Sequence, residues 1–186
     1  MNLFPYIAGF IFLATEIVLN RMLRSTAGDK QGTDKQSISL IWVTVILSIT
    51  IAGYVAGKFQ APIFSNHLHV YVGVALIFIG IIIRFVAVYS LGQFFTVDVT
   101  IRKSHRLKKN GLFKYIRHPN YAALLISFLG VGITDNNWYS LLIIFIPILT
   151  AFIVRINIEE KVLIEHFGVE YLNYKRSTKR LLPFIY

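Results

Sequence analysis

Five long apolar runs constrain this chain more than any other feature of its sequence. They lie near residues 3–21, 38–57, 69–90, 121–134 and 138–155. A helix that crosses the hydrocarbon core of a bilayer needs about 20 apolar residues. The pattern therefore predicts an all-α, polytopic integral membrane protein with about five transmembrane helices. The first run has no basic leader and no small-residue cleavage site, so we do not expect a removable signal peptide.

Composition supports a membrane protein and excludes several other classes. Hydrophobic residues make up 55% of the 186-residue chain, which is more than an ordinary soluble domain contains. The chain has no cysteine, so it has no disulfide framework, thiolate nucleophile or thiolate metal site, and we expect no metal centre. The net charge is +10, but no nucleic-acid module accompanies it, so we expect this charge to face anionic lipid and no nucleic acid.

The basic residues are distributed unevenly between the connections. Lys and Arg number four in 21–37, seven in 91–120 and six in 155–186, which is 17 of the 19 in the chain. An excess of Lys and Arg marks the cytoplasmic side of a membrane protein. We therefore expect the amino terminus outside and the 91–120 segment and the carboxyl terminus in the cytoplasm.

We treat residues 1–186 as one membrane domain. Residues 1–90 supply three N-terminal spans, and residues 91–186 hold a long polar segment, a helical hairpin and C-terminal helices. The stretch from 89 to 121 is too long for an idle loop, because connections longer than about 12–15 residues are usually functional or disordered. Pro119 biases His118 away from helical dihedrals and predicts a helix that begins near 119–120. The backbone donors of that helix start favour a carboxylate beside Arg117 and His118.

A second polar group follows the fifth apolar run. Arg155 and Glu159 are four residues apart, so a continuing helix places them on one face, with Glu160 next to them. An alternative is a simple ion pair that stabilises the helix. Gly168 is expected to end this helix, and the amphipathic tail that follows should place Tyr171 and Tyr174 on one side.

Other polar and small residues lie inside the apolar runs. Glu16 is expected to be structural, satisfied by Arg21 or Asn20 near the inner end of the first run, although an acid within a span is a candidate functional residue. Arg84 is expected to snorkel to the inner face. Gly130 and Gly132 are typical of close helix packing and do not form a dinucleotide fingerprint.

Two ordered motifs resemble a known family. The stretches "HRLKKNGLFKYIRHPNYAALL" and "RINIEEKVLIEHFGVEYLNYKRS" are similar to those of the isoprenylcysteine carboxyl methyltransferase family. Its members are membrane enzymes that move a methyl group from S-adenosylmethionine to a prenylcysteine carboxylate. The similarity runs from about residue 91 to 184. Relatives of this family also methylate phospholipids and other lipids, so the acceptor stays open.

The resemblance implies that residues 91–186 are the catalytic part, with a cytoplasmic cofactor segment and active site. Arg155 would bind the substrate, and Phe113 stands where the family often has a tyrosine. Thr100 matches an upstream cofactor contact only if a gap is allowed. The catalytic candidates are Arg155, Arg117 and Glu160. The candidate residues for S-adenosylmethionine binding are Thr100, His105, Arg106, Leu107, Lys108, Phe113, His118, Pro119, Asn120, Tyr121 and Glu159.

The chemistry of methyl transfer suits these residue types. Transfer from a sulfonium is an in-line displacement, so the enzyme mainly aligns donor and acceptor. A carboxylate acceptor is ionised at neutral pH and needs only a cation such as Arg155. An amine or hydroxyl acceptor would need a base, for which Glu160 or His118 are candidates.

We therefore predict carboxyl O-methylation of an isoprenylcysteine-like substrate, with S-adenosylmethionine as cofactor. The expected partners are a prenylated cysteine or another lipophilic small molecule, and membrane lipid. The alternatives are O- or N-methylation of another lipid and a non-catalytic membrane scaffold.

Overall fold

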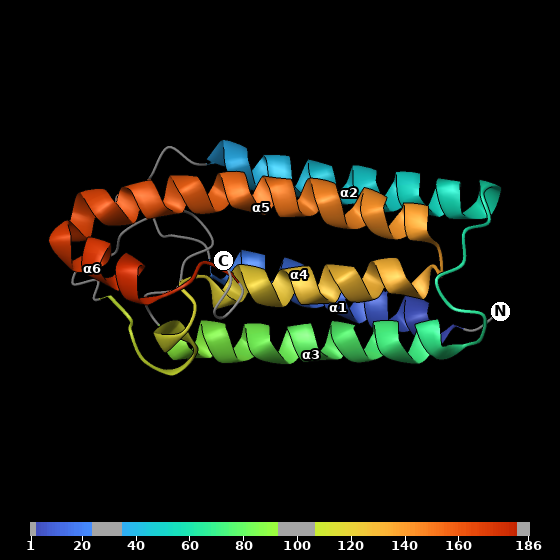
Figure 1. Cartoon of the computed structure of the whole chain (residues 1–186), viewed down its shortest axis with the longest axis horizontal. Helices are drawn as coiled ribbons and strands as arrows, with labels where there is room; N and C mark the ends of the chain where they lie inside the picture. The colour runs from blue at the N-terminus through green and yellow to red at the C-terminus, as the bar shows by residue number, and fades with distance from the viewer. Residues whose placement is uncertain (1–2, 24–34, 93–106, 182–186) are drawn as a thin grey trace.

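The computed structural model describes residues 3–23, 35–92 and 107–181 of the chain. Within these ranges the regular structure is helical apart from one isolated parallel bridge, in agreement with the all-α prediction. The elements are α1 (Phe4–Met22), α2 (Lys35–Lys58), α3 (Leu68–Leu91), the short 3-10 helix η2 (Gly111–Lys114), α4 (Pro119–Thr134), α5 (Trp138–Phe167) and α6 (Val169–Ser177). Figure 1 shows α1 to α5 lying side by side in one bundle, with α6 at one end.

Four of the described helices are long and apolar enough to cross a membrane, namely α1, α2, α3 and α5. Each of the five apolar runs in the sequence is a helix, so the prediction of about five is confirmed in outline. The fourth, α4, is apolar but has only 16 residues. Its length of about 24 Å is shorter than a hydrocarbon core of roughly 30 Å.

Small residues bring α3 and α4 into close contact along their length. A Cβ atom on Gly130 would lie 2.5 Å from the carbonyl oxygen of Gly73, and one on Gly80 would lie 2.6 Å from that of Ala123. Gly132 lies close to α5, because its Cβ would lie 2.8 Å from a methyl group of Leu141 and 3.1 Å from the Cα of that residue. The expectation of close helix packing at Gly130 and Gly132 is confirmed.

Aromatic rings join α1, α4 and α5 in the core of the bundle. Phe12 and Phe128 meet edge to face with ring centroids 5.1 Å apart, and Phe128 lies 6.4 Å from Phe152. Phe152 in turn lies 5.4 Å from Tyr121, at the start of α4. Such offset and edge contacts add to the apolar burial of the rings, so the core fixes one side of Tyr121.

The helix α5 continues well beyond the expected span of 138–155. Asn137 caps its start by accepting hydrogen bonds from the backbone amides of Tyr139 and Ser140 at 3.0 and 3.2 Å. Its 30 residues extend about 45 Å. The helix ends at Gly168, whose φ of 54° suits glycine, as the sequence predicts. Figure 1 shows that α5 runs past its neighbours and that α6 folds back at this end.

Residues 178–181, which we call the strap, return to the start of α4. Ile116 and Lys179 form a parallel bridge. The amides of Arg117 and His118 donate to the carbonyl oxygens of Lys179 and Arg180 at 2.7 and 3.0 Å. Leu181 is buried in the core, so the strap anchors the chain segment that leads into α4.

Candidate active site

The site is built around the residue that precedes α4. His118 has φ −122° and ψ 58°, outside the helical region, and Pro119 occupies the first turn. This is the helix start predicted from Pro119. Proline has no amide hydrogen, and the amides of a first helical turn have no partner within the helix, so nothing is lost there. Arg117 and His118 are both buried. Their side chains are thus held inside the protein and do not act as exposed anchors.

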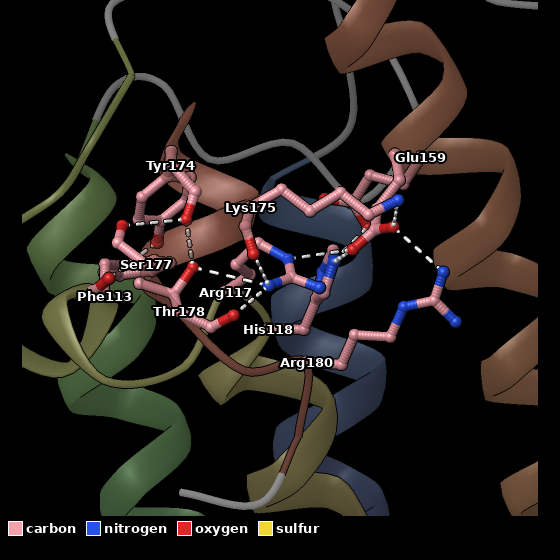
Figure 2. Close-up of polar contacts among 10 residues, drawn as sticks. Phe113, Arg117, His118, Glu159, Tyr174, Lys175, Ser177, Thr178 and Arg180 are labelled. Atoms are coloured by element: carbon pink, nitrogen blue, oxygen red, sulfur yellow. Dashed lines mark hydrogen bonds and ion pairs between the residues drawn. The ribbon is translucent and has the colours of Figure 1, made fainter. Parts of the chain in front are cut away.

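The carboxylate of Glu160 contacts four basic side chains at this end of the bundle. Oε1 of Glu160 accepts from Nε of Arg117 at 2.9 Å and lies 3.3 Å from Nε2 of His118. Oε2 accepts from Arg180 at 3.0 Å and lies 3.1 Å from Nζ of Lys175. We call these five residues the Glu160 cluster (Figure 2). Both carboxylate oxygens are engaged, and a carboxylate stabilised by three cations is a poor proton acceptor.

The Glu160 cluster is tied to the backbone of α6 and the strap. Nη1 of Arg117 donates to the carbonyl oxygen of Lys175 at 3.1 Å and to that of Thr178. The hydroxyl of Thr178 donates to the carbonyl oxygen of Tyr174 at 2.6 Å. The hydroxyl of Tyr174 donates to the carbonyl oxygen of Phe113 at 2.6 Å. Figure 2 shows these contacts on one side of Arg117, so one guanidinium joins α4, α5 and the tail.

A second polar group, which we call the Tyr121 group, lies beside the first and consists of Ser37, Tyr121, Arg155 and Glu159. The hydroxyl of Tyr121 donates to Oε2 of Glu159 at 3.0 Å and accepts from Nε of Arg155 at 3.3 Å. Arg155 also donates through Nη1 to the hydroxyl of Ser37 in α2. The guanidinium of Arg155 is therefore oriented by two hydroxyl groups from different helices.

His118 connects the two polar groups. Its Nδ1 lies 3.8 Å from Oε2 of Glu159, while its Nε2 faces Glu160. The two neighbouring carboxylates differ in accessibility, because the side chain of Glu159 is 32% exposed and that of Glu160 is 3% exposed. Glu159 is the one that a ligand from solution can reach.

Tyr171 of α6 is a polar residue of this region that lacks a partner. It is 1% exposed, and its hydroxyl has no hydrogen-bond partner among the described residues. Burial, followed by the negative charges of Glu160 and Glu159, raises the pKa of Tyr171, so the hydroxyl keeps its proton. A buried hydroxyl normally has a partner, and Tyr171 therefore offers a donor to a bound group.

Comparison with known proteins gives the family. The model of the isoprenylcysteine carboxyl methyltransferase (ICMT) family matches residues 73–165, which is half of the chain. The chain belongs to this family. The match begins within α3 and ends near the C-terminal end of α5. It therefore includes the polar residues of the site at the start of α4 and on α5.

Several curated relatives resemble the ICMT-family chain described here. Protein-S-isoprenylcysteine O-methyltransferase A of Arabidopsis thaliana is 32% identical over 115 residues, which cover 61% of this chain and 58% of that protein. Protein-S-isoprenylcysteine O-methyltransferase of Saccharomyces cerevisiae is 34% identical over 115 residues, covering 61% and 48%. The aligned part is thus about half to three fifths of these relatives.

A solved structure shares the fold. The eukaryotic intramembrane Ras methyltransferase ICMT, determined without a monobody, superposes with a TM-score of 0.60 at 23% identity. The similarity covers 83% of this chain and 55% of that one. With four helices of spanning length, this neighbour and the family match support an integral membrane protein.

The structure brings together six of the site residues expected from the sequence: Arg117, His118, Tyr121, Arg155, Glu159 and Glu160. Phe113 is buried, and its carbonyl oxygen receives Tyr174. Leu107 and Lys108 are half-buried. Thr100, His105 and Arg106 lie outside the described residues, so their assignment stays a prediction.

Arg84 differs from the expectation, whereas the assignment of Asn120 to the cofactor stays a prediction. Arg84 donates through Nε to Oε1 of Glu16 at 2.5 Å and through Nη1 to Oδ1 of Asn120. The expected snorkelling of Arg84 is wrong, because the residue is buried and faces α1 and α4. Glu16 pairs with Arg84, a partner that the sequence analysis did not name. The side-chain oxygen of Asn120 is directed to α3.

Four residues of the site were missed in the sequence: Ser37, Tyr171, Lys175 and Arg180. All four lie outside residues 73–165, which the family model covers. The basic residues near the C-terminus could have suggested partners for Glu160. Nothing local points to Ser37, since it enters the site only through the packing of α2 on α5.

Proposed function

We propose that this chain transfers a methyl group from S-adenosylmethionine to the carboxylate of an isoprenylcysteine-like acceptor in the membrane. Membership of the ICMT family and the names of its curated relatives support the reaction. The observation that carries the proposal is the Tyr121 group. In it, a buried guanidinium and an accessible carboxylate are held on one tyrosine hydroxyl.

The residues present suit the proposed cofactor. When bound, S-adenosylmethionine supplies a methyl group activated by a sulfonium. Glu159 is accessible and would hold its ammonium. The face of Tyr121 can attract a positively charged sulfur, as aromatic rings attract other cations. The orphan hydroxyl of Tyr171 would donate to one of its oxygen atoms.

Arg155 is the residue that we propose for the acceptor carboxylate. Its guanidinium is buried and is oriented by Tyr121 and Ser37. A guanidinium in a fixed orientation matches the planar geometry of a carboxylate.

The Glu160 cluster supports an acceptor that needs no base. The two oxygens of Glu160 are engaged by Arg117, Lys175 and Arg180, with His118 alongside. We propose that Glu160 holds these residues in place and does not remove a proton. A carboxylate acceptor, with an unperturbed pKa of about 4, is already ionised at neutral pH.

The position of the site suits reactants from two phases. The helix α4 is about 24 Å long, so its start lies close to one boundary of a core of roughly 30 Å. We propose that the lipid tail of the acceptor enters from the bilayer and the cofactor from water. The excess of basic residues at this end supports a cytoplasmic active site, with the amino terminus outside. A reporter fused after Tyr186 that reads as translocated would contradict this orientation.

Methyl transfer from radiolabelled S-adenosylmethionine, measured with protein in lipid nanodiscs, tests the proposal. The acceptors are N-acetyl-S-farnesylcysteine, its carboxamide, a farnesylated phenol and phosphatidylethanolamine. We expect label only in the free acid, as a base-labile methyl ester, and a rate that does not rise with pH above neutrality. Labelling of the phenol or the amine would change the acceptor class. No labelling and no cofactor binding by calorimetry would indicate a non-catalytic scaffold.

Arg155→Gln tests the role of the acceptor cation within this assay. Loss of a buried charge partner costs about 2 kcal/mol or more, so turnover of the acid should fall about 30-fold or further while cofactor affinity is kept. Arg176→Gln is the control, because Arg176 is exposed on α6. Equal rates for the two variants would remove Arg155 from the proposal.

A further inference from the structure

A polar triad within the bundle is not used by the proposed function. It consists of Glu16 of α1, Arg84 of α3 and Asn120 of α4. The side chain of Arg84 is 8% exposed and that of Glu16 is 12% exposed, with 2.5 Å between Nε and Oε1. The same guanidinium donates to Oδ1 of Asn120. Three helices that are apart in sequence thus meet through one arginine.

Arg84 continues the contact line between α3 and α4. Along α3, the residues that face α4 are Gly73, Ile77, Gly80 and Arg84, which are three or four positions apart. Their counterparts on α4 run in the opposite direction, as Gly130, Ser127, Ala123 and Asn120. The Arg84–Asn120 contact is therefore the last step of this line before the start of α4.

A charged pair in this position needs an explanation beyond packing. Ionisable residues within membrane helices are costly and usually functional. An apolar pair of similar volume often stabilises a buried site as well or better. The remainder of the α3–α4 line is already close-packed by small residues. The association of α3 and α4 therefore does not depend on the triad.

The triad does act on one particular turn. Asn120 precedes Tyr121, and successive helical side chains point about 100° apart. On α4, Asn120 faces α3 and α1 through Arg84, while Tyr121 faces α5 through Glu159 and Arg155. The rotation of the first turn of α4 about its axis determines where the hydroxyl of Tyr121 lies.

We propose that Arg84, neutralised by Glu16, is a positioning residue that fixes Asn120 and so keeps the Tyr121 hydroxyl on Glu159 and Arg155. This inference rests on the proposed function. Asn120 then serves the site through α3 and is not itself a contact of the cofactor. A misplacement of about 1 Å in a reacting site can cost about 100-fold in rate, so a small rotation of α4 is sufficient for a large effect.

Three substitutions test the proposal in nanodiscs, well below the unfolding temperature. Arg84→Lys keeps the charge but loses the planar fork that reaches both partners. Asn120→Leu removes the acceptor, and Asn120→Asp retains it. The matched control is Ser127→Ala, which removes another polar contact of the same line, Ser127 Oγ to the carbonyl oxygen of Ile77 at 3.3 Å, about 10 Å further from the site.

We expect Arg84→Lys and Asn120→Leu to weaken binding of S-adenosylmethionine and kcat by about tenfold or more. Asn120→Asp should stay within about threefold of the wild type, since it keeps the acceptor. Ser127→Ala should lower the thermal midpoint while affinity and turnover stay at the wild-type level. The double variant Glu16→Leu with Arg84→Met removes both charges and should fold, but it should show the Asn120→Leu defect.

Two results would overturn the inference. Wild-type affinity and turnover in Arg84→Lys and in the double variant would make the triad purely structural. A defect in Asn120→Leu with no defect in either Arg84 variant would make Asn120 a direct contact of the cofactor. If the proposed function is wrong, the wild-type protein itself will neither bind S-adenosylmethionine nor transfer its methyl group. This result needs no variant, and the inference would then fall as well.

Discussion

Replacement of Glu160 by glutamine should destabilise the fold more than any other single exchange of similar size at this end of the bundle. Glu160→Gln keeps the shape of the side chain and removes its charge. Arg117 is then left with its side chain 6% exposed and without its carboxylate. Breaking a buried pair by removing one partner costs about 3–5 kcal/mol, because an uncompensated charge stays in the interior.

Lys175 and Arg180 of the Glu160 cluster contribute much less to this cost. The side chains of Lys175 and Arg180 are 38% and 21% exposed, so water can solvate them when Glu160 loses its charge. An ion pair that is substantially exposed contributes about 0–1 kcal/mol. Lys175→Gln is therefore a matched comparison, since it removes a charge from the same carboxylate at an accessible position.

Thermal unfolding in a mild detergent, followed by circular dichroism, measures the difference. At about 2–4 °C per kcal/mol for a chain of this size, Glu160→Gln should lower the midpoint by about 6–20 °C. Lys175→Gln should lower it by less than about 4 °C. Equal shifts in the two variants would refute the reasoning that the buried Arg117 contact dominates the cluster.

Three other predictions address single groups. Tyr171→Phe removes the orphan hydroxyl, so the protein should be at least as stable as the wild type. Its affinity for S-adenosylmethionine should fall by about 5–10-fold. Unchanged affinity in calorimetry would mean that the hydroxyl contacts no ligand. Ser37→Ala removes the hydroxyl that accepts from Arg155, so it should raise the KM for the acceptor but not for the cofactor. The control is Ser48→Ala, which is buried on the same helix about 16 Å away and should change neither KM. Burial raises the pKa of Asp135, so the folded protein loses stability as pH rises from the unfolded pKa of this carboxyl through its higher folded pKa. Asp135→Asn should therefore raise the thermal midpoint at pH 7 relative to the wild type and make little difference near pH 3.

The features that could be predicted from the sequence are those with local causes. Pro119 has no amide hydrogen and a fixed φ, so it marks the start of α4 wherever the helix lies. Gly168 adopts a positive φ at the end of α5 for a reason confined to that residue. The apolar runs reflect the surroundings of each helix and therefore predict all five helices of the bundle.

The pairs that build the site could not be predicted from local patterns. Glu16 and Arg84 are 68 residues apart, and no spacing rule relates them. The snorkelling expectation for Arg84 assumed a helix face turned to lipid, but the small residues Gly73 and Gly80 turn this face to α4. The motif resemblance supplied His118, Tyr121 and Glu159, and it assigned no role to Ser37, Tyr171, Lys175 or Arg180.

The strap has a consequence for how the protein is made. Residues 178–181 pair with the backbone at 115–118, yet the ribosome synthesises them after all five helices of the bundle. Membrane helices can enter the bilayer one by one, each satisfying its own backbone. Insertion and completion of the site are then separate events. A nascent chain that has inserted α5 still lacks the carbonyl groups of Lys175 and Thr178 that accept from Arg117, and the backbone at 115–118 is paired only when the strap docks.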